Sequence, residues 1–200
     1  MSDQGSIRYI SHPHPVTGVT NSKLGVWCFL ASEVMLFGAL FSAYILLRTG
    51  VSSWPHGSLL LNVPLATLNT MILISSSVTM VMSWASLALN DIKKYRLYMT
   101  VTILCGLAFL VVKTFEYGHK FEHHHFPSTD NFYAIYFALT GLHCLHVIGG
   151  LIVNAYLLFP GSALWKKDPD QFRGRVEAAG LYWHFVDLVW IFLFPVLYLL

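Results

Sequence analysis

Six ionisable side chains lie inside long apolar runs of the sequence or directly beside one, and these are the residues whose chemistry needs an explanation. They are Glu33, His143, His146, Glu177, His184 and Asp187. A polar side chain at bilayer depth is costly, and it usually faces the interior of a helix bundle or takes part in proton or ion chemistry. A buried polar cluster that exchanges protons or fixes lipid is therefore the functional interpretation. Hydrogen bonding that only locks the helices together is the alternative, and we favour it for His184 and Asp187.

Helical spacing predicts that these groups meet in one layer of the bilayer. At 1.5 Å rise per residue, Glu33 lies roughly 14 Å and His146 roughly 18 Å from the cytoplasmic ends of their spans, and Asp187 reaches about the same depth. His143 lies one turn further out on the face of His146, because residues three apart share a face. Glu33 is a lone carboxyl in the middle of its span, and we expect it to be neutral because desolvation disfavours the charged form.

Composition places the chain among membrane proteins. Hydrophobic residues make up 56% of its 200 residues and charged residues 11%, more apolar than a soluble core of this size requires. The net charge of +2 comes without a continuous basic stripe, which excludes nucleic acid as a partner. Cys28, Cys105 and Cys144 lie in separate apolar runs without a Cys-x-x-Cys pair, so we interpret them as small hydrophobic residues.

The apolar runs predict an all-α integral membrane bundle of five transmembrane helices within residues 24–200. A hydrocarbon core of about 30 Å requires about 20 apolar residues in a helix. The five predicted spans are 24–47, 65–89, 97–117, 131–158 and 178–199. Residues 1–23 are polar, lack the charged-then-apolar order of a signal peptide, and are predicted to form a cytoplasmic tail.

The distribution of Lys and Arg predicts the orientation of the bundle. One set of connections contains Arg8, Lys23, Lys93, Lys94, Arg96, Lys166, Lys167, Arg173 and Arg175. The opposite connections contain only Arg48 and Lys120. Because cytoplasmic loops carry an excess of Lys and Arg, we expect the N-terminus in the cytoplasm and the C-terminus outside.

Three residues near the ends of the spans are candidates for the membrane interface. Glu116 and Tyr117 follow the third apolar run together with Lys113, and long side chains there are expected to extend toward the interface. Trp54 lies in the connection after the first span.

A histidine-rich connection offers a second possible chemistry. It contains His119, His123, His124 and His125, and its spacing partly resembles the histidine boxes of membrane di-iron desaturases. Such enzymes need several boxes on one side of the membrane, whereas this run is predicted outside and His143 and His146 within the bilayer. We favour a solvated loop that binds zinc only adventitiously.

Seven short segments carry a resemblance to a known family. They are Ser32–Phe37, Trp54–Pro55, Val63–Leu65, Leu68–Thr70, Phe115–Tyr117, Thr140–Ile148 and Glu177–Asp187. In this order they resemble the successive signatures of subunit III of haem-copper terminal oxidases, which use cytochrome c or quinol. The spans identify the five-helix bacterial type, which lacks the two extra N-terminal helices that form one arm of a lipid-filled cleft in longer members.

The resemblance implies an accessory, non-redox subunit of a proton-pumping complex that reduces oxygen to water in a bacterial plasma membrane. Haem and copper are then held by partner subunits, with catalytic subunit I and subunit II as neighbours. A small subunit IV or respiratory supercomplex partners are further candidates. The subunit is expected to support assembly, to hold phospholipid, and to sustain proton uptake and turnover. The electron donor binds to other subunits.

The resemblance also implies roles for the six ionisable residues. Glu33 matches the family's buried helix carboxyl, and His143 with His146 matches its paired histidines. Glu177, His184 and Asp187 match the polar set of the last helix. Two alternatives stay open: a small transporter or proton channel, which predicts ion flux from this chain alone, and a di-iron enzyme, which predicts iron at the histidine-rich run.

Overall fold

The computed structural model describes residues 18, 20–51, 54–55, 57–122 and 126–200. Within these residues the chain forms helices and turns and no strand. The long helices are α1 (Asn21–Thr49), α3 (Val63–Ala88), α4 (Ile92–Glu122), α5 (Asn131–Leu158) and α6 (Pro169–Phe194). The short elements are α2 (Gly57–Leu60), the 3-10 helix η1 (Gly161–Lys166) and the π-helical turn η2 (Pro195–Leu199). Most of the predicted N-terminal tail and His123–His125 fall outside the described residues.

Five helices of the described chain are long and apolar enough to cross a membrane, which confirms the predicted all-α bundle. Some of their ends differ from the predicted spans. α6 begins at Pro169 rather than at residue 178, because Asp168 Oδ1 accepts a hydrogen bond from the backbone N–H of Gln171 at 2.9 Å. An aspartate cap followed by proline starts a helix whether or not the next residues are apolar.

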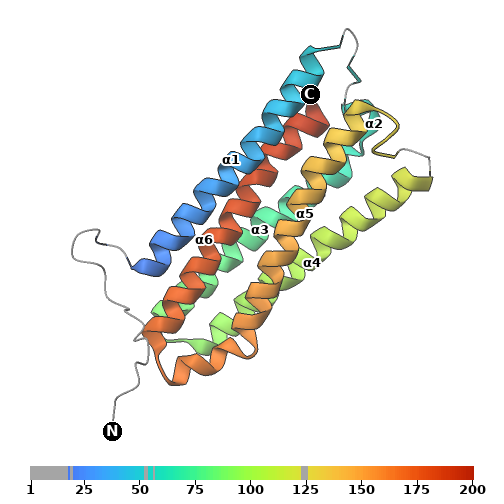
Figure 1. The fold of residues 1–200 in the computed structure, drawn as a ribbon. Helices are drawn as coiled ribbons and strands as arrows, with labels where there is room; N and C mark the ends of the chain where they lie inside the picture. The colour runs from blue at the N-terminus through green and yellow to red at the C-terminus, as the bar shows by residue number, and fades with distance from the viewer. Residues whose placement is uncertain (1–17, 19, 52–53, 56, 123–125) are drawn as a thin grey trace.

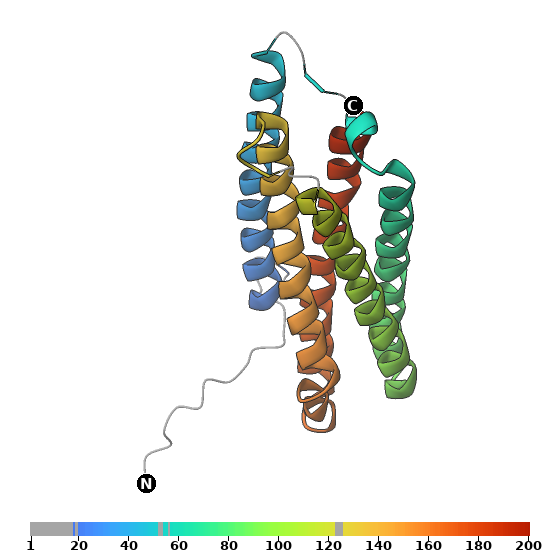
Figure 2. The same ribbon diagram turned by 90° about the vertical axis from the view of Figure 1, so that its right-hand side faces the viewer.

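α6 lies at the centre of the bundle. It contacts α1, α3 and α5, while α4 packs between α3 and α5 (Figure 1). In the second view α1 and α3 lie on opposite sides of the molecule (Figure 2). The polar residues of α6 can therefore find partners on two sides of the helix, from α1 on one side and from α3 on the other.

Glycines allow the centre of the bundle to pack closely. The indole of Trp183, on α6, is fully buried. A Cβ atom added to Gly150 would lie 2.7 Å from this ring, and one added to Gly106 would lie 2.8 Å from it. Only glycine at these positions lets α5 and α4 approach the indole without a clash.

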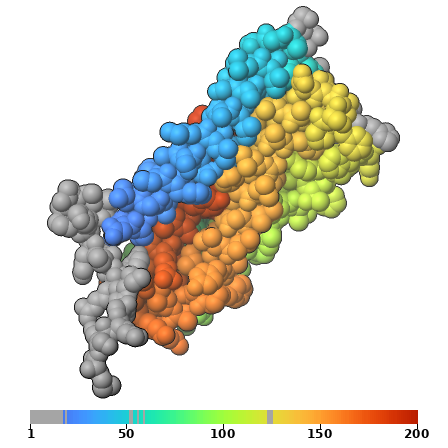
Figure 3. Space-filling view, in the orientation of Figure 1, coloured from blue at the N-terminus to red at the C-terminus, as the bar shows by residue number. Residues whose placement is uncertain are grey.

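α1 is attached much more loosely than α6. Of the 18 residues in an apolar stretch of α1, only 11% are buried within the chain. The corresponding share is 50% for a stretch of the same length in the last helical segment, Pro169–Leu199. The space-filling view shows α1 as an outer helix along one face, with α5 beside it (Figure 3). Large apolar side chains such as Trp27, Met35 and Leu46 are exposed on α1 and are available to lipid or to a partner subunit.

The turn between α3 and α4 is held at the edge of the bundle by polar contacts. Asp91 Oδ1 accepts hydrogen bonds from the backbone N–H groups of Lys93 and Lys94, each at 3.1 Å. The bond from Lys94 lowers the pKa of this carboxyl. Arg173 of α6 donates to the carbonyl of Leu87 at 3.1 Å and to the side chain of Asn90 at 2.6 Å. These bonds fix the start of α6 against the end of α3.

Candidate functional site

Glu33 and His146 form a pair between α1 and α5. Glu33 Oε2 lies 2.8 Å from His146 Nε2, and their side chains are 14% and 13% exposed. The two groups, which were predicted to lie at similar depth, are in contact in the structure. The description of Glu33 as a lone carboxyl is wrong, because the histidine supplies a partner from another helix.

The hydrogen bonds of His146 define how this pair holds a proton. His146 Nδ1 lies 2.8 Å from the carbonyl oxygen of Leu142. A carbonyl oxygen only accepts, so Nδ1 must carry hydrogen and donate it. One further proton then lies between Glu33 Oε2 and His146 Nε2, either as a carboxylic acid beside a neutral imidazole or as a carboxylate beside an imidazolium. The pair is neutral overall in both arrangements.

An apolar groove of about 280 Å³ runs beside this pair between α1 and α6. Its lining residues are Val34, Phe37, Gly38, Phe41, Phe185, Leu188, Val189, Phe192 and Val196. The ring of Phe37 also contacts the imidazole of His146, with centroids 5.2 Å apart. The groove therefore presents a hydrocarbon surface next to a proton-holding pair.

His143 lies on the same helix but has a different environment. It is fully buried, and its ring packs 5.5 Å from Phe109 and 5.1 Å from Trp190, centroid to centroid. Neither ring nitrogen has a hydrogen-bond partner within the described part of the chain. The ring of His146 thus meets α1 and that of His143 meets α4, while both also lie against aromatic rings of α6.

The polar set of α6 divides among three environments. Glu177 forms an ion pair with Lys23 at 2.7 Å, with both side chains about one third exposed. His184 Nδ1 lies 2.6 Å from Ser77 Oγ of α3. Asp187 is buried, and Ser77, which also contacts His184, interacts with its carboxylate from beyond normal hydrogen-bond distance.

The ionisable groups that were predicted to share one layer therefore do not form a single hydrogen-bonded cluster, and their common depth stays a prediction. Among the described residues, no hydrogen bond or ion pair joins Glu177, His184 or Asp187 to the Glu33–His146 pair. Helical depth set the level of each group, but the direction in which each side chain leaves α6 separates them.

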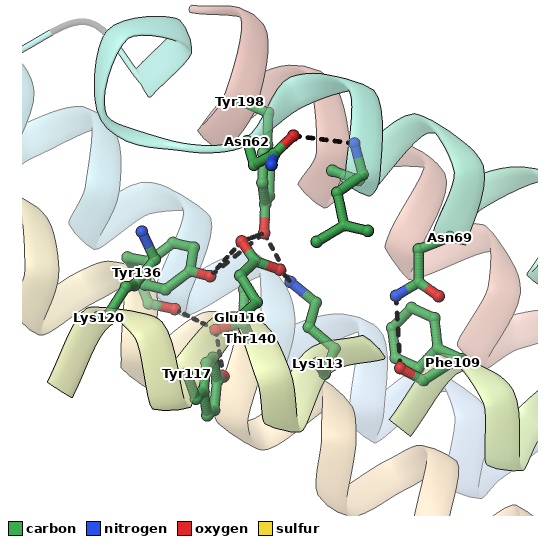
Figure 4. Close-up of polar contacts among 12 residues, drawn as sticks. Asn62, Asn69, Phe109, Lys113, Glu116, Tyr117, Lys120, Tyr136, Thr140 and Tyr198 are labelled. Atoms are coloured by element: carbon green, nitrogen blue, oxygen red, sulfur yellow. Dashed lines mark hydrogen bonds and ion pairs between the residues drawn. The ribbon is translucent and has the colours of Figure 1, made fainter. Parts of the chain in front are cut away.

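A buried cluster at the other end of the bundle was missed by the sequence reasoning. Lys113 and Glu116, both on α4, are 2% and 7% exposed, with Lys113 Nζ 2.9 Å from Glu116 Oε2. Glu116 Oε1 accepts hydrogen bonds from the hydroxyls of Tyr136 at 2.9 Å and Tyr198 at 2.6 Å. Lys113 also donates to the Tyr198 hydroxyl at 2.6 Å (Figure 4). Its ammonium lies 4.6 Å from the ring centroid of Trp190. Every charged atom of this pair thus has a partner.

The prediction that Lys113 and Glu116 extend to the interface is wrong for a physical reason. α4 continues to Glu122, so both residues lie well inside the helix, and α5 and η2 provide hydroxyls that replace water. The available signal was their spacing, because residues three apart lie on the same face of a helix.

The other two interface candidates also contact the rest of the chain. The hydroxyl of Tyr117 lies 2.6 Å from Thr140 Oγ1 of α5 (Figure 4). The indole of Trp54 packs edge-on against Tyr44 and Phe132, with ring centroids 5.8 and 5.9 Å away. Both residues therefore join elements of the bundle.

No metal-binding group of three or more His, Cys, Asp and Glu side chains occurs among the described residues. His119 is described, near the C-terminal end of α4, whereas His123, His124 and His125 are not. The proposed role of this run stays a prediction.

Comparisons with known proteins agree on one family. Residues 7–200 match the family model described as cytochrome c oxidase subunit III. The chain is 35% identical over 194 residues to cytochrome c oxidase subunit 3 of Alkalihalophilus pseudofirmus, which covers 95% of this chain and 92% of that protein. It is 37% identical over 179 residues to the protein of the same name from Corynebacterium diphtheriae, covering 88% and 86%, and 32% identical over 182 residues to that of Bacillus subtilis, covering 90% and 86%.

Proposed function

Because the chain belongs to the cytochrome c oxidase subunit III family, we propose that it supports the assembly, lipid content, proton uptake and turnover lifetime of the catalytic subunit of a terminal oxidase. It is a multi-pass protein of a bacterial plasma membrane and a subunit of an oxidoreductase complex, and the chain alone is not the catalytic unit. The proposal concerns what this subunit contributes to that complex.

In this proposal haem and copper are bound by partner subunits, with subunit I and subunit II as direct neighbours. A small subunit IV and supercomplex partners are further candidates. The environment of the membrane histidines supports this assignment. His146 is already engaged by Glu33 and by a backbone carbonyl, and His143 is enclosed by aromatic rings. Neither imidazole is presented to a ligand outside the bundle.

The observation that carries the proposal is the Glu33–His146 pair beside the α1–α6 groove. The pair lies at bilayer depth in a largely apolar environment, where a neutral, proton-sharing pair costs less than an isolated charge. The groove beside it has the apolar lining that an acyl chain requires. Lipid held here would fill the space between the loosely attached α1 and neighbouring subunits and would keep water from the pair.

The experiment that tests this proposal is Glu33→Gln in the intact oxidase. Three properties are measured: haem-bearing subunit co-purified through this chain, phospholipid retained per complex, and turnovers completed before inactivation. Glutamine keeps a hydrogen bond to His146 but cannot share a proton, so we expect lipid retention and turnover lifetime to fall.

Glu122→Gln is the matched control, because Glu122 is exposed at the end of α4. This control should leave all three properties unchanged. If Glu33→Gln also leaves all three unchanged, the pair has no role in oxidase support.

A further inference from the structure

Lys120, near the C-terminal end of α4, is a buried cation that has no anionic partner among the described residues. Lys120 is only 6% exposed. Its ammonium donates to the carbonyl oxygen of Leu60 at 3.4 Å, which is longer than a normal hydrogen bond. It also lies 5.2 Å and 5.7 Å from the ring centroids of Tyr136 and Tyr133. No described carboxylate forms an ion pair with it.

The nearby Glu116 does not form an ion pair with Lys120, because both oxygens of Glu116 are bound by other groups. Its two oxygens accept from Lys113, Tyr136 and Tyr198, so Lys113 and Glu116 form an internally neutral pair. With both lysines protonated, the three ionisable groups carry a net charge of +1. A cation removed from water requires a counter-charge or good hydrogen-bond acceptors, and Lys120 has neither within the described chain.

A pocket of about 290 Å³ opens beside this cation. It is lined by Leu60, Asn62, Leu65, Phe115, Glu116, His119 and Lys120. The polar members Asn62, Glu116, His119 and Lys120 lie near the start of α3 and in the last two turns of α4, and Glu116 is paired with Lys113. We infer from the lengths of these helices that this level corresponds to the lipid headgroups. Phe115 is 73% exposed and lies one turn or more deeper along α4. The pocket thus combines a headgroup-level cation with an apolar lower wall.

We propose that this pocket binds the phosphate group of an anionic membrane phospholipid. Lys120 provides the counter-charge and donates to a phosphate oxygen, and an acyl chain lies along Leu65 and Phe115. A charge-assisted bond to phosphate replaces the long contact to the Leu60 carbonyl. The site lies between α3 and α4, whereas the Glu33 groove lies between α1 and α6. The proposal for one site can therefore be refuted while the proposal for the other stands.

The test uses the intact oxidase complex, purified in mild detergent and stripped of lipid by detergent exchange. Phosphatidylglycerol is titrated in, and bound lipids are counted by native mass spectrometry. Lys120→Met should lose one tightly bound phosphatidylglycerol, with an affinity lower by about 10- to 100-fold, the value of one hydrogen bond to a charged group. Lys94→Met removes an exposed lysine from the opposite end of α4 and should leave the tight site intact.

A second variant tests the shape of the pocket independently of the lysine charge. Leu65→Phe narrows the pocket and keeps Lys120, and it should also remove the tight lipid. Unchanged lipid affinity in both variants overturns the proposal. Displacement of the lipid by millimolar inorganic phosphate would show a free-anion site instead. Loss of a neighbouring subunit in Lys120→Met without loss of lipid would show that a partner's carboxylate fills the pocket.

Discussion

Glu33 and Glu116 are both carboxyls within membrane-spanning helices, and their surroundings differ in two ways. Glu116 is enclosed at the junction of α4, α5 and η2 and accepts from one ammonium and two hydroxyls. Glu33 stands on the least buried long helix and forms a hydrogen bond with His146, whose ring contacts Phe37 in the lining of the apolar groove. The first group is fully paired inside the chain, and the second is accessible from its surroundings.

This difference separates a structural carboxyl from a functional candidate. Moving a charge into a low-dielectric interior is tolerated when all its hydrogen-bonding atoms are paired, and such a group then holds one conformation. A carboxyl with fewer partners, on a helix that is mostly exposed within the chain, depends more on whatever packs against that helix. Stability should therefore depend on Glu116 and its partners, whereas oxidase support should depend on Glu33.

The largest expected effect comes from breaking the Glu116 cluster. Lys113→Met leaves a buried carboxylate without its ammonium and should cost about 3–5 kcal/mol in the free energy of unfolding, measured by denaturing-detergent titration of the reconstituted chain. The double variant Lys113→Met with Glu116→Gln removes both charges and should regain much of that loss. A cost below about 1 kcal/mol for the single variant would contradict a structural role.

The next effect tests the close packing of the central helices. Gly150→Ala places a Cβ atom 2.7 Å from the buried Trp183 ring and should cost about 1–3 kcal/mol in the same titration. Gly141→Ala is the matched control on α5, because nothing lies within 4 Å of its added Cβ. Equal effects of the two substitutions would show that the indole does not limit the approach of α5.

A smaller effect on stability is expected for the Glu33 pair. Glu33→Gln keeps a hydrogen bond to His146 and changes no packing, so the unfolding free energy of the isolated chain should fall by only about 0.5–1.5 kcal/mol. The companion variant His146→Phe removes the partner of Glu33. Its loss of unfolding free energy should not exceed that of Lys113→Met. A Glu33→Gln loss as large as that of the Lys113 variant would abolish the distinction between the two carboxyls.

The smallest effect is expected at the ion pair between Lys23 and Glu177. Both side chains are about one third exposed, so water and salt screen their attraction. Lys23→Met should change the unfolding free energy by less than about 1 kcal/mol, and adding salt should reduce the difference between variant and wild type. A salt-independent loss would indicate that Lys23 acts through packing.

Much of the bundle was predictable, because the length of an apolar run is a local property. The run 131–158 coincides with α5, and the other four spans lie largely within helices. The similar depth of Glu33 and His146 followed from the fixed rise per residue of long helices, whereas their contact was not predicted. The start of α6 was misplaced, because the cap at Asp168 acts independently of hydropathy.

The sequence by itself determined the fold class, the family and the depth of each polar group, because these depend on residue type and on the constant rise of a helix. Only the tertiary structure decided which neighbour each polar group meets. Lys113 and Glu116 are buried because Tyr136 and Tyr198 reach them from α5 and from the last turn of the chain. Within the described part of the chain Lys120 forms no ion pair, because the nearby carboxylate of Glu116 is already paired with Lys113. Such pairings join residues far apart in the chain, and no local pattern encodes them.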